Sequence, residues 1–364
     1  MSEALRPHLG PHELFASWYI RQERNELITL VGDADRLLGS QRLPLAPVRE
    51  LLREWERQIE DITARRGVGA PRRPPPLGDL PDLVQQLGAC AIPDALRDAA
   101  RDPRYRRLVA LPDGLIHSMP IDLVVVRAAM LPITRVFVDG VVTAPSAASF
   151  VYARGKSRDE SAPFAALLLK QGDADLEEEV ETVRKALPFP STVVRHRDQL
   201  AELNERISLL YVASHGETST PGRVGDHELG FDWRIEFDGG GGALQADDFY
   251  SGEIRLRPGA VVVISACSVG QVAAGPMHEL RGMVNALFYA GAANVLAARW
   301  PLPYETARHV FAGTVRDHYR DGTALASALR SNLLSAIYDP TIRALVRPGQ
   351  WPFFFGPFVL AGAG

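Results

Sequence analysis

The chain has 364 residues, 46% of them hydrophobic, and a formal net charge of −4 with a pI near 6.2. This length and apolar content allow one large domain with an extension, or two domains. The slightly acidic balance disfavours a dedicated nucleic-acid binder. No stretch reaches the roughly 18 consecutive apolar residues that a membrane-spanning helix needs.

The two cysteines, Cys90 and Cys267, lie in separate parts of the chain. This arrangement disfavours a disulfide framework and favours the reducing cytosol. The first 14 residues lack a charged region followed by an apolar one, so the sequence predicts no secretory signal. We therefore expect a cytoplasmic protein with neither a membrane nor a nucleic acid as partner.

Residues 1–100 are predicted to form a helical amino-terminal region. Apolar residues at helical spacing predict two amphipathic helices, at 12–38 and 45–64, joined as a hairpin. A break rich in Gly and Pro follows at 66–76, and residues 77–100 are predicted to be helical again.

From Tyr105 onward, short strand-like segments replace this pattern. Strands are predicted at 107–111, 115–116, 123–126 and 134–138, followed by a helix at 146–152. Further strands are predicted at 164–169, 192–194, 208–213, 260–266, 294–298 and 353–361. Helices at 175–187, 197–206, 277–290, 304–319 and 323–337 alternate with them. This alternation predicts an α/β fold for residues 105–364, with a mainly parallel sheet sandwiched by helices.

Two of the predicted strands end on reactive side chains. His215 follows the apolar run LLYVAS, and Cys267 follows VVVISA. Strands this apolar are typical of a sheet buried on both faces, and chemistry in such sheets gathers at the carboxyl ends of the strands. A thiol needs a neighbouring imidazole to act as a nucleophile at neutral pH. The order of His first and Cys about 50 residues later fits a caspase-type arrangement.

The pair predicts cysteine-peptidase chemistry. The imidazole of His215 would hold Cys267 as a thiolate, which attacks a peptide carbonyl, and His215 would then protonate the leaving amine. The backbone N–H groups of Gly216 and Cys267 are candidates for the oxyanion hole. Gly216 has no Cβ, so it would let the scissile carbonyl approach.

An ordered set of motifs from Tyr105 to the end of the chain resembles the CHAT family of caspase-like proteins, within the wider group of caspases, metacaspases, separase and gingipains. The motifs are Leu111-Pro112-Asp113-Gly114-Leu115, Met119-Pro120-Ile121 with Leu123, Pro145-Ser146, Ala213-Ser214-His215-Gly216, Ser265-Ala266-Cys267-Ser268-Val269-Gly270, Tyr289-Ala290-Gly291-Ala292, Arg299-Trp300-Pro301 and Trp351-Pro352-Phe353. The resemblance implies a caspase-like sheet and a catalytic dyad of His215 and Cys267.

The specificity pocket is harder to predict. Relatives that cleave after Lys or Arg often carry an acidic residue two positions before the cysteine, where this chain has Ser265. Asp173 and Asp175 follow the first core strand, where related enzymes place pocket residues, and would favour a basic side chain. Alternatively, Asp175 caps the next helix. Trp300 follows another core strand, either lining the substrate groove or packing in the core.

No pattern predicts a metal or a cofactor. Asp226, His227 and Glu228 are consecutive, so their side chains point in different directions, and no second cluster supports them. The glycine run at 239–242 is not followed by the Lys and Ser or Thr of a phosphate loop.

The sequence thus favours a bacterial cytoplasmic cysteine endopeptidase that cleaves a partner protein. The resemblance implies roles in bacterial immunity, including antiviral defence, and in regulated cell death, with an activating or regulatory partner protein. Two alternatives remain. One is a catalytically silent scaffold with the CHAT fold; the other is a small-molecule thiol hydrolase, although the Gly-x-Ser-x-Gly nucleophile elbow is missing.

Overall fold

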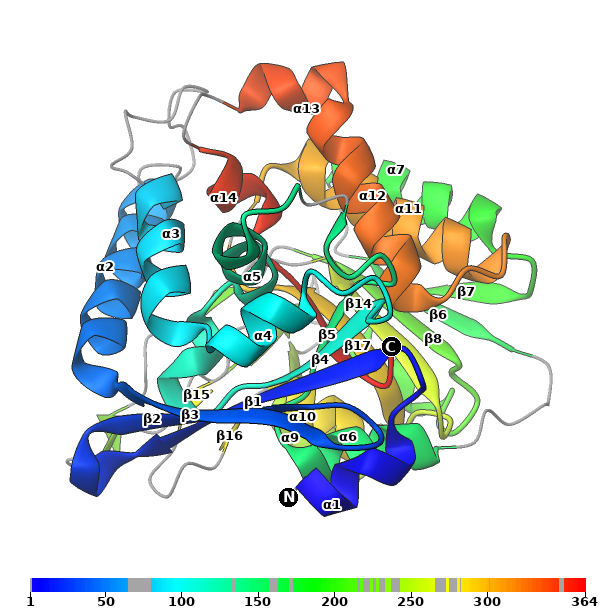
Figure 1. Ribbon diagram of the computed structural model, residues 1–364. Helices are drawn as coiled ribbons and strands as arrows, with labels where there is room; N and C mark the ends of the chain where they lie inside the picture. Colours follow the sequence, from blue (N-terminus) through cyan, green and yellow to red (C-terminus); the bar gives the residue numbers. More distant parts are fainter. Residues whose placement is uncertain are drawn as a thin grey trace. The chain divides into compact units, whose positions relative to one another are not determined.

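The computed structural model of the chain (Figure 1) falls into two compact units. Unit 1 comprises Met1–Ala147 and Leu333–Pro357, and unit 2 comprises Ala148–Asn332 and Phe358–Gly364. The residues that the structure describes are 2–64, 80–132, 135–156, 163–169, 173–214, 217–218, 223–224, 227–228, 233–236, 243–265, 273–274, 280–281, 283–300, 302–346 and 350–364.

The strands of unit 1 lie in the order β3-β2-β1-β4-β5. Their bounds are β1 (Glu13–Arg21), β2 (Glu26–Gly32), β3 (Leu37–Pro44), β4 (Arg107–Leu111) and β5 (Val141–Thr143). The first three form an antiparallel meander, whereas β4 is parallel to both of its neighbours, β1 and β5. The sequence predicts a domain boundary at residues 100–105. Strand β1, before this position, pairs with β4, after it. The boundary itself stays a prediction.

The predicted helix at 12–38 is wrong, because this segment forms the β1–β3 meander. Asn25, at a left-handed φ of 50°, ends the 3-10 turn η2 (Gln22–Arg24) between β1 and β2. The carboxylate of Asp33 accepts the N–H groups of Asp35 and Arg36 at 2.9 and 2.8 Å and so forms the second turn. Alternate residues of β2 are buried, as expected of a strand.

Helices cover one face of the unit 1 strands (Figure 1). They are α2 (Leu45–Ala64), α3 (Leu80–Ala91), α4 (Asp94–Ala99) and α5 (Ile121–Ala129). The predicted helix at 45–64 is confirmed, and the Trp18 indole of β1 donates to the Ala91 carbonyl of α3 at 2.8 Å. The predicted strand at 123–126 is wrong, since Pro120 and Asp122 provide a helix start before its valine run.

The remainder of unit 1 consists of short elements: α1 (Ser2–Leu5), η1 (Arg6–His8), η3 (Gly114–Ser118), α13 (Pro340–Leu345) and α14 (Trp351–Phe355). The Asp113 carboxylate accepts a hydrogen bond from the N–H of Ile20 on β1 at 2.9 Å. The Pro-Asp-Gly motif therefore connects the end of β4 to β1. The predicted strand at 115–116 is therefore wrong, because η3 follows that contact. Residues 135–138 form no strand either, and β5 begins only at Val141.

The strands of unit 2 lie in the order β18-β17-β14-β8-β6-β7. They are β6 (Ala165–Leu169), β7 (Ser191–Val194), β8 (Leu209–Ala213), β14 (Ala260–Ser265), β17 (Ala292–Ala298) and β18 (Phe358–Gly362). All pairings are parallel except that of β17 with β18. Apart from β7, every residue of these strands is buried, which confirms the prediction of a sheet covered on both faces.

Helices pack on both faces of this sheet (Figure 1). One face is covered by α6 (Ala147–Gly155), α8 (Arg197–Ala201), α9 (Ala246–Tyr250) and α10 (Met283–Tyr289) around a core that includes Val262, Ile264 and Phe249. The other face carries α7 (Ala174–Ala186) and α11 (Tyr304–Tyr319). The fold class predicted from the sequence, α/β with a mainly parallel sheet between helices, is confirmed.

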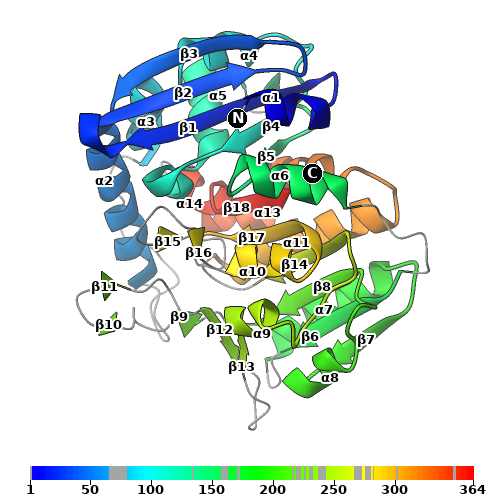
Figure 2. The ribbon, with the colours of Figure 1, turned by 90° about the horizontal axis from the view of Figure 1, so that it is seen from below.

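Short strands follow β8 along the chain. They include β9 (Glu217–Thr218), β10 (Arg223–Val224), β11 (His227–Glu228), β12 (Trp233–Glu236) and β13 (Ala243–Gln245), with β15 (Ala273–Ala274) and β16 (Leu280–Arg281) after β14. The three strands β13-β12-β9 form an antiparallel sheet beside α9 (Figure 2). α12 (Leu325–Tyr338) follows α11 and crosses the division between the two units.

The carboxyl-terminal segment was predicted as one strand at 353–361. Instead, α14 ends at Phe355 and β18 begins at Phe358, because Gly356 and Pro357 interrupt the apolar run.

Gly291 explains one of the sequence motifs in structural terms. It lies in the turn from α10 to β17 at a φ of +123°, and a Cβ there would be 2.6 Å from the carbonyl oxygen of Leu256. Its own carbonyl accepts the N–H of Gly259 at 3.0 Å. The Tyr-Ala-Gly-Ala motif therefore provides a close backbone crossing that a side chain would obstruct.

Candidate active site

The carboxyl ends of β8 and β14 lie side by side in unit 2. Ala213 pairs with Ser265 in parallel register, and the N–H of Ser214 donates to the Ser265 carbonyl at 3.5 Å. Neighbouring strands in such a sheet are about 4.8 Å apart. His215, Gly216 and Cys267 lie outside the described residues, so the structure brings together the residues that lead into them, and the dyad itself stays a prediction.

Asp173 caps the amino terminus of α7. Its Oδ1 accepts the N–H groups of Asp175 and Leu176 at 3.0 and 3.2 Å. The capping residue is thus Asp173 rather than Asp175, whose carbonyl accepts the hydroxyl of Tyr304 instead. A carboxylate in this position also interacts favourably with the helix dipole. A further contribution of either aspartate to a substrate pocket stays a prediction.

Trp300 lies two residues after the end of β17 and is buried, with 3% of its surface exposed; Arg299 before it is also buried. This burial agrees with the core-packing alternative that the sequence left open. The proposed role of Trp300 in a substrate groove stays a prediction.

A buried polar cluster below the end of β14 was not predicted. Glu179 of α7 has no exposed surface, and its Oε1 accepts a hydrogen bond from the Tyr211 hydroxyl of β8. The Ser265 hydroxyl also takes part in this hydrogen-bonded group. In the part of the chain that the structure describes, the second carboxyl oxygen of Glu179 has no hydrogen-bond partner.

Burial dominates the electrostatics of this cluster. It raises the pKa of Glu179, against the opposing effects of hydrogen bonds from Ser265 and Tyr211 and of the Arg308 charge. Burial and the nearby carboxyl place the pKa of Tyr211 well above its ordinary value, and they raise the pKa of Tyr304 to about 12. Arg308, at the edge of the cluster, pairs with Glu178 at 2.6 Å.

A signal for Glu179 was present in the sequence. Leu176, Val180 and Val183 form the buried face of α7, and Glu179 occupies the same face at helical spacing. In the sequence it is the last of three consecutive glutamates, and the two before it are exposed.

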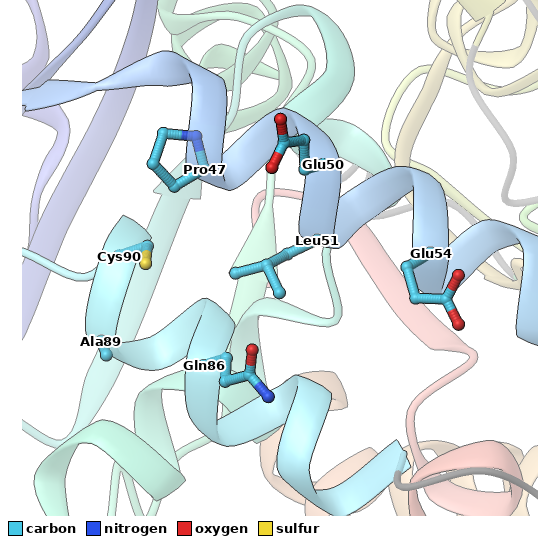
Figure 3. Close-up of a pocket in the computed structure, with 7 residues that line it drawn as sticks. All are labelled: Pro47, Glu50, Leu51, Glu54, Gln86, Ala89 and Cys90. Atoms are coloured by element: carbon cyan, nitrogen blue, oxygen red, sulfur yellow. The ribbon is translucent and has the colours of Figure 1, made fainter.

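A shallow hollow of about 480 Å³ lies between α2 and α3 in unit 1 (Figure 3). Leu51 and Ala89 form apolar parts of its wall, and Glu50 and Cys90 also line it. The thiol of Cys90, on α3, is only half-buried. No imidazole is among the described residues that line this hollow, so it does not resemble the predicted thiol site.

The residues that the structure describes hold no group of three or more His, Cys, Asp or Glu side chains suited to a metal ion. Within the same ranges, no helix has the length and apolar character to cross a bilayer.

The α/β fold, with a mainly parallel sheet between helices, is similar to that of solved structures of known proteins. Solved structures of separase in complex with securin, from Saccharomyces cerevisiae, match 99% of this chain with TM-scores of 0.55 and 0.53 at 10% identity. This chain spans about 30% of the length of those separase chains. Gingipain R, an Arg-specific cysteine proteinase, matches 87% of this chain and 74% of its own, with a TM-score of 0.47 at 8% identity. At 10% identity, the match to the separase structures shows the fold alone.

The CHAT domain family model matches residues 81–363, and the chain therefore belongs to this family. The match begins within α3, in the region predicted to be a helical extension. Comparison with curated proteins gives no match.

Proposed function

We propose that this CHAT-domain protein is a cysteine endopeptidase that uses His215 and Cys267 to cleave a partner protein. The observation that supports this proposal is the register of β8 with β14, in which Ala213 lies opposite Ser265. The chain continues from these neighbouring strand ends into the two reactive residues.

The proposed reaction proceeds by nucleophilic catalysis. The imidazole of His215 accepts the thiol proton of Cys267, and the thiolate sulfur forms a bond to the scissile carbonyl carbon. The N–H groups of Gly216 and Cys267 stabilise the oxyanion. The C–N bond then breaks as His215 protonates the leaving amine, and water hydrolyses the thioester.

The remaining assignments follow from the family and the composition. We place the peptidase domain at residues 105–364, with Asp173, Asp175 and Trp300 beside the substrate, and the protein in the bacterial cytoplasm. Roles in immunity and regulated cell death belong to the same proposal. The similar separase structure contains securin, which supports a regulatory protein partner here as well.

A labelling and cleavage experiment tests the proposal. A thiol-reactive peptide electrophile should label Cys267 much faster than Cys90, and Cys267→Ala should abolish cleavage of a peptide library without unfolding the protein. Cys90→Ala is the matched control and should cleave normally. Persistent cleavage by the Cys267→Ala protein would contradict the mechanism. Equal labelling of the two cysteines would favour a silent scaffold, whereas ester hydrolysis without proteolysis would favour a small-molecule hydrolase.

A further inference from the structure

We propose that Glu179 is a positioning residue for the candidate active site: it holds together the ends of the two strands that precede His215 and Cys267. This inference rests on the proposed function, because it assigns Glu179 a role in the alignment of that dyad. Glu179 itself touches neither reacting group in this proposal and acts through Tyr211 and Ser265.

The cluster joins three elements at one face of the unit 2 sheet. Tyr211 lies four positions before His215 and pairs with Val263 in β14, while Ser265 lies two positions before Cys267. Because side chains alternate along a strand, Tyr211 and Ser265 project to the same face, where α7 packs. A single carboxyl on α7 can therefore interact with both strands.

A buried carboxyl is a costly way to fill this position. An unpartnered buried oxygen lowers stability, and replacing both Glu179 and Tyr211 by apolar side chains of similar size would be neutral or favourable by comparison. A hydrogen bond also requires a particular geometry, so it fixes the positions and orientations of the side chains that it joins. Such precision matters beside a nucleophile, where a displacement of about 1 Å can reduce the rate by about 10²-fold.

Groups from α11 complete the surroundings of Glu179. The phenol of Tyr304 and the guanidinium of Arg308 lie near it, and Arg308 is itself paired with Glu178. A glutamine at position 179 has the length of glutamate and keeps a carbonyl oxygen, so it can still accept the hydrogen bond of the Tyr211 hydroxyl. A leucine at this position has similar size but no hydrogen bonds.

The test compares Glu179→Gln, Glu179→Leu and Tyr211→Phe in the full chain. Glu181→Gln is the matched control, because Glu181 lies on the same helix in an exposed ion pair with Arg184. Two quantities are measured: the rate at which iodoacetamide alkylates Cys267 relative to Cys90 across a pH series, and kcat and KM for a cleaved peptide. Circular dichroism establishes that each variant is folded.

We expect Glu179→Leu and Tyr211→Phe to lower kcat by about ten- to a hundredfold, with KM nearly unchanged. Both should move the pH midpoint of Cys267 alkylation towards that of Cys90. Glu179→Gln and Glu181→Gln should stay close to wild type.

A purely structural role predicts a different result. Lower thermal stability with an unchanged alkylation ratio and unchanged kcat in both Glu179→Leu and Tyr211→Phe would overturn the positioning role alone. Equal losses in the Gln and Leu variants would also overturn it. If wild-type Cys267 reacts no faster than Cys90, the dyad fails, and the positioning role fails with it.

Discussion

The hydrogen bond between Tyr211 and Glu179 should show strong energetic coupling. Tyr211→Phe removes the hydroxyl that donates to Glu179 Oε1. The other carboxyl oxygen, Oε2, has no partner among the described residues even in wild type. Leaving a buried polar group unsatisfied costs about 1–3 kcal/mol. Glu179→Leu should cost a similar amount, because it leaves the fully buried Tyr211 hydroxyl without this acceptor.

The double variant should cost much less than the sum of the two single ones. With both polar groups replaced by apolar ones, neither desolvation penalty remains, so we expect a coupling energy of about 1–2 kcal/mol. The measurement is urea denaturation of wild type, both single variants and the double variant. The exposed pair of Glu181 and Arg184, 2.7 Å apart, provides a control cycle that should give at most about 0.5 kcal/mol.

Two results would refute this reasoning. Additive costs in the buried cycle would mean that the two groups do not depend on each other for their burial. A loss below about 0.5 kcal/mol for Tyr211→Phe would mean that water or another group replaces the hydroxyl without penalty.

Two further predictions concern stability. Gly291→Ala should lower the free energy of unfolding by at least about 2 kcal/mol, because its Cβ would lie 2.6 Å from the Leu256 carbonyl oxygen. Gly322→Ala is the control: Gly322 has a φ of +70°, but an added Cβ would meet open space, so this change should cost only about 1 kcal/mol. Equal losses of stability for the two variants in urea denaturation would contradict the steric argument. The second prediction concerns pH. Burial raises the pKa of Glu179, so above the ordinary glutamate pKa of 4.5 the folded state binds more protons than the unfolded state. The free energy of unfolding of wild type should therefore fall, relative to that of Glu179→Gln, as pH rises above this value. The slope is at most about 1.4 kcal/mol per pH unit, and a stability difference that is equal at pH 5 and pH 7.5 would contradict it.

The parallel core of unit 2 could be predicted from sequence because its strands are apolar throughout and separated by clear helical segments. Local patterns were sufficient to locate these strands, because a strand buried on both faces is a continuous run of apolar residues, as in β14. The same reasoning failed in unit 1. The apolar residues Leu14, Trp18, Leu27 and Val31 have helical spacing, but the first two lie on β1 and the last two on β2. Strand β1 also pairs with β4, which is distant in the sequence.

The candidate site was predicted in part for a similar reason. The positions of strand ends follow from sequence patterns, and their adjacency follows from the parallel topology, as the pairing of Ala213 with Ser265 shows. The position of Glu179 depends on which face of α7 meets the sheet. A charge run conceals that face, and the tertiary partner Tyr211 is 32 positions away.

The interleaving of the two units has a consequence for biosynthesis. Unit 1 takes Leu333–Pro357 and unit 2 takes Phe358–Gly364 from late in the chain. Domains tend to fold during translation as their residues emerge from the ribosome, yet neither unit can finish folding until these late segments emerge. A nascent chain would therefore expose the edge of β17 that β18 later covers. Completion of the candidate active-site scaffold is thereby linked to the end of synthesis of this region.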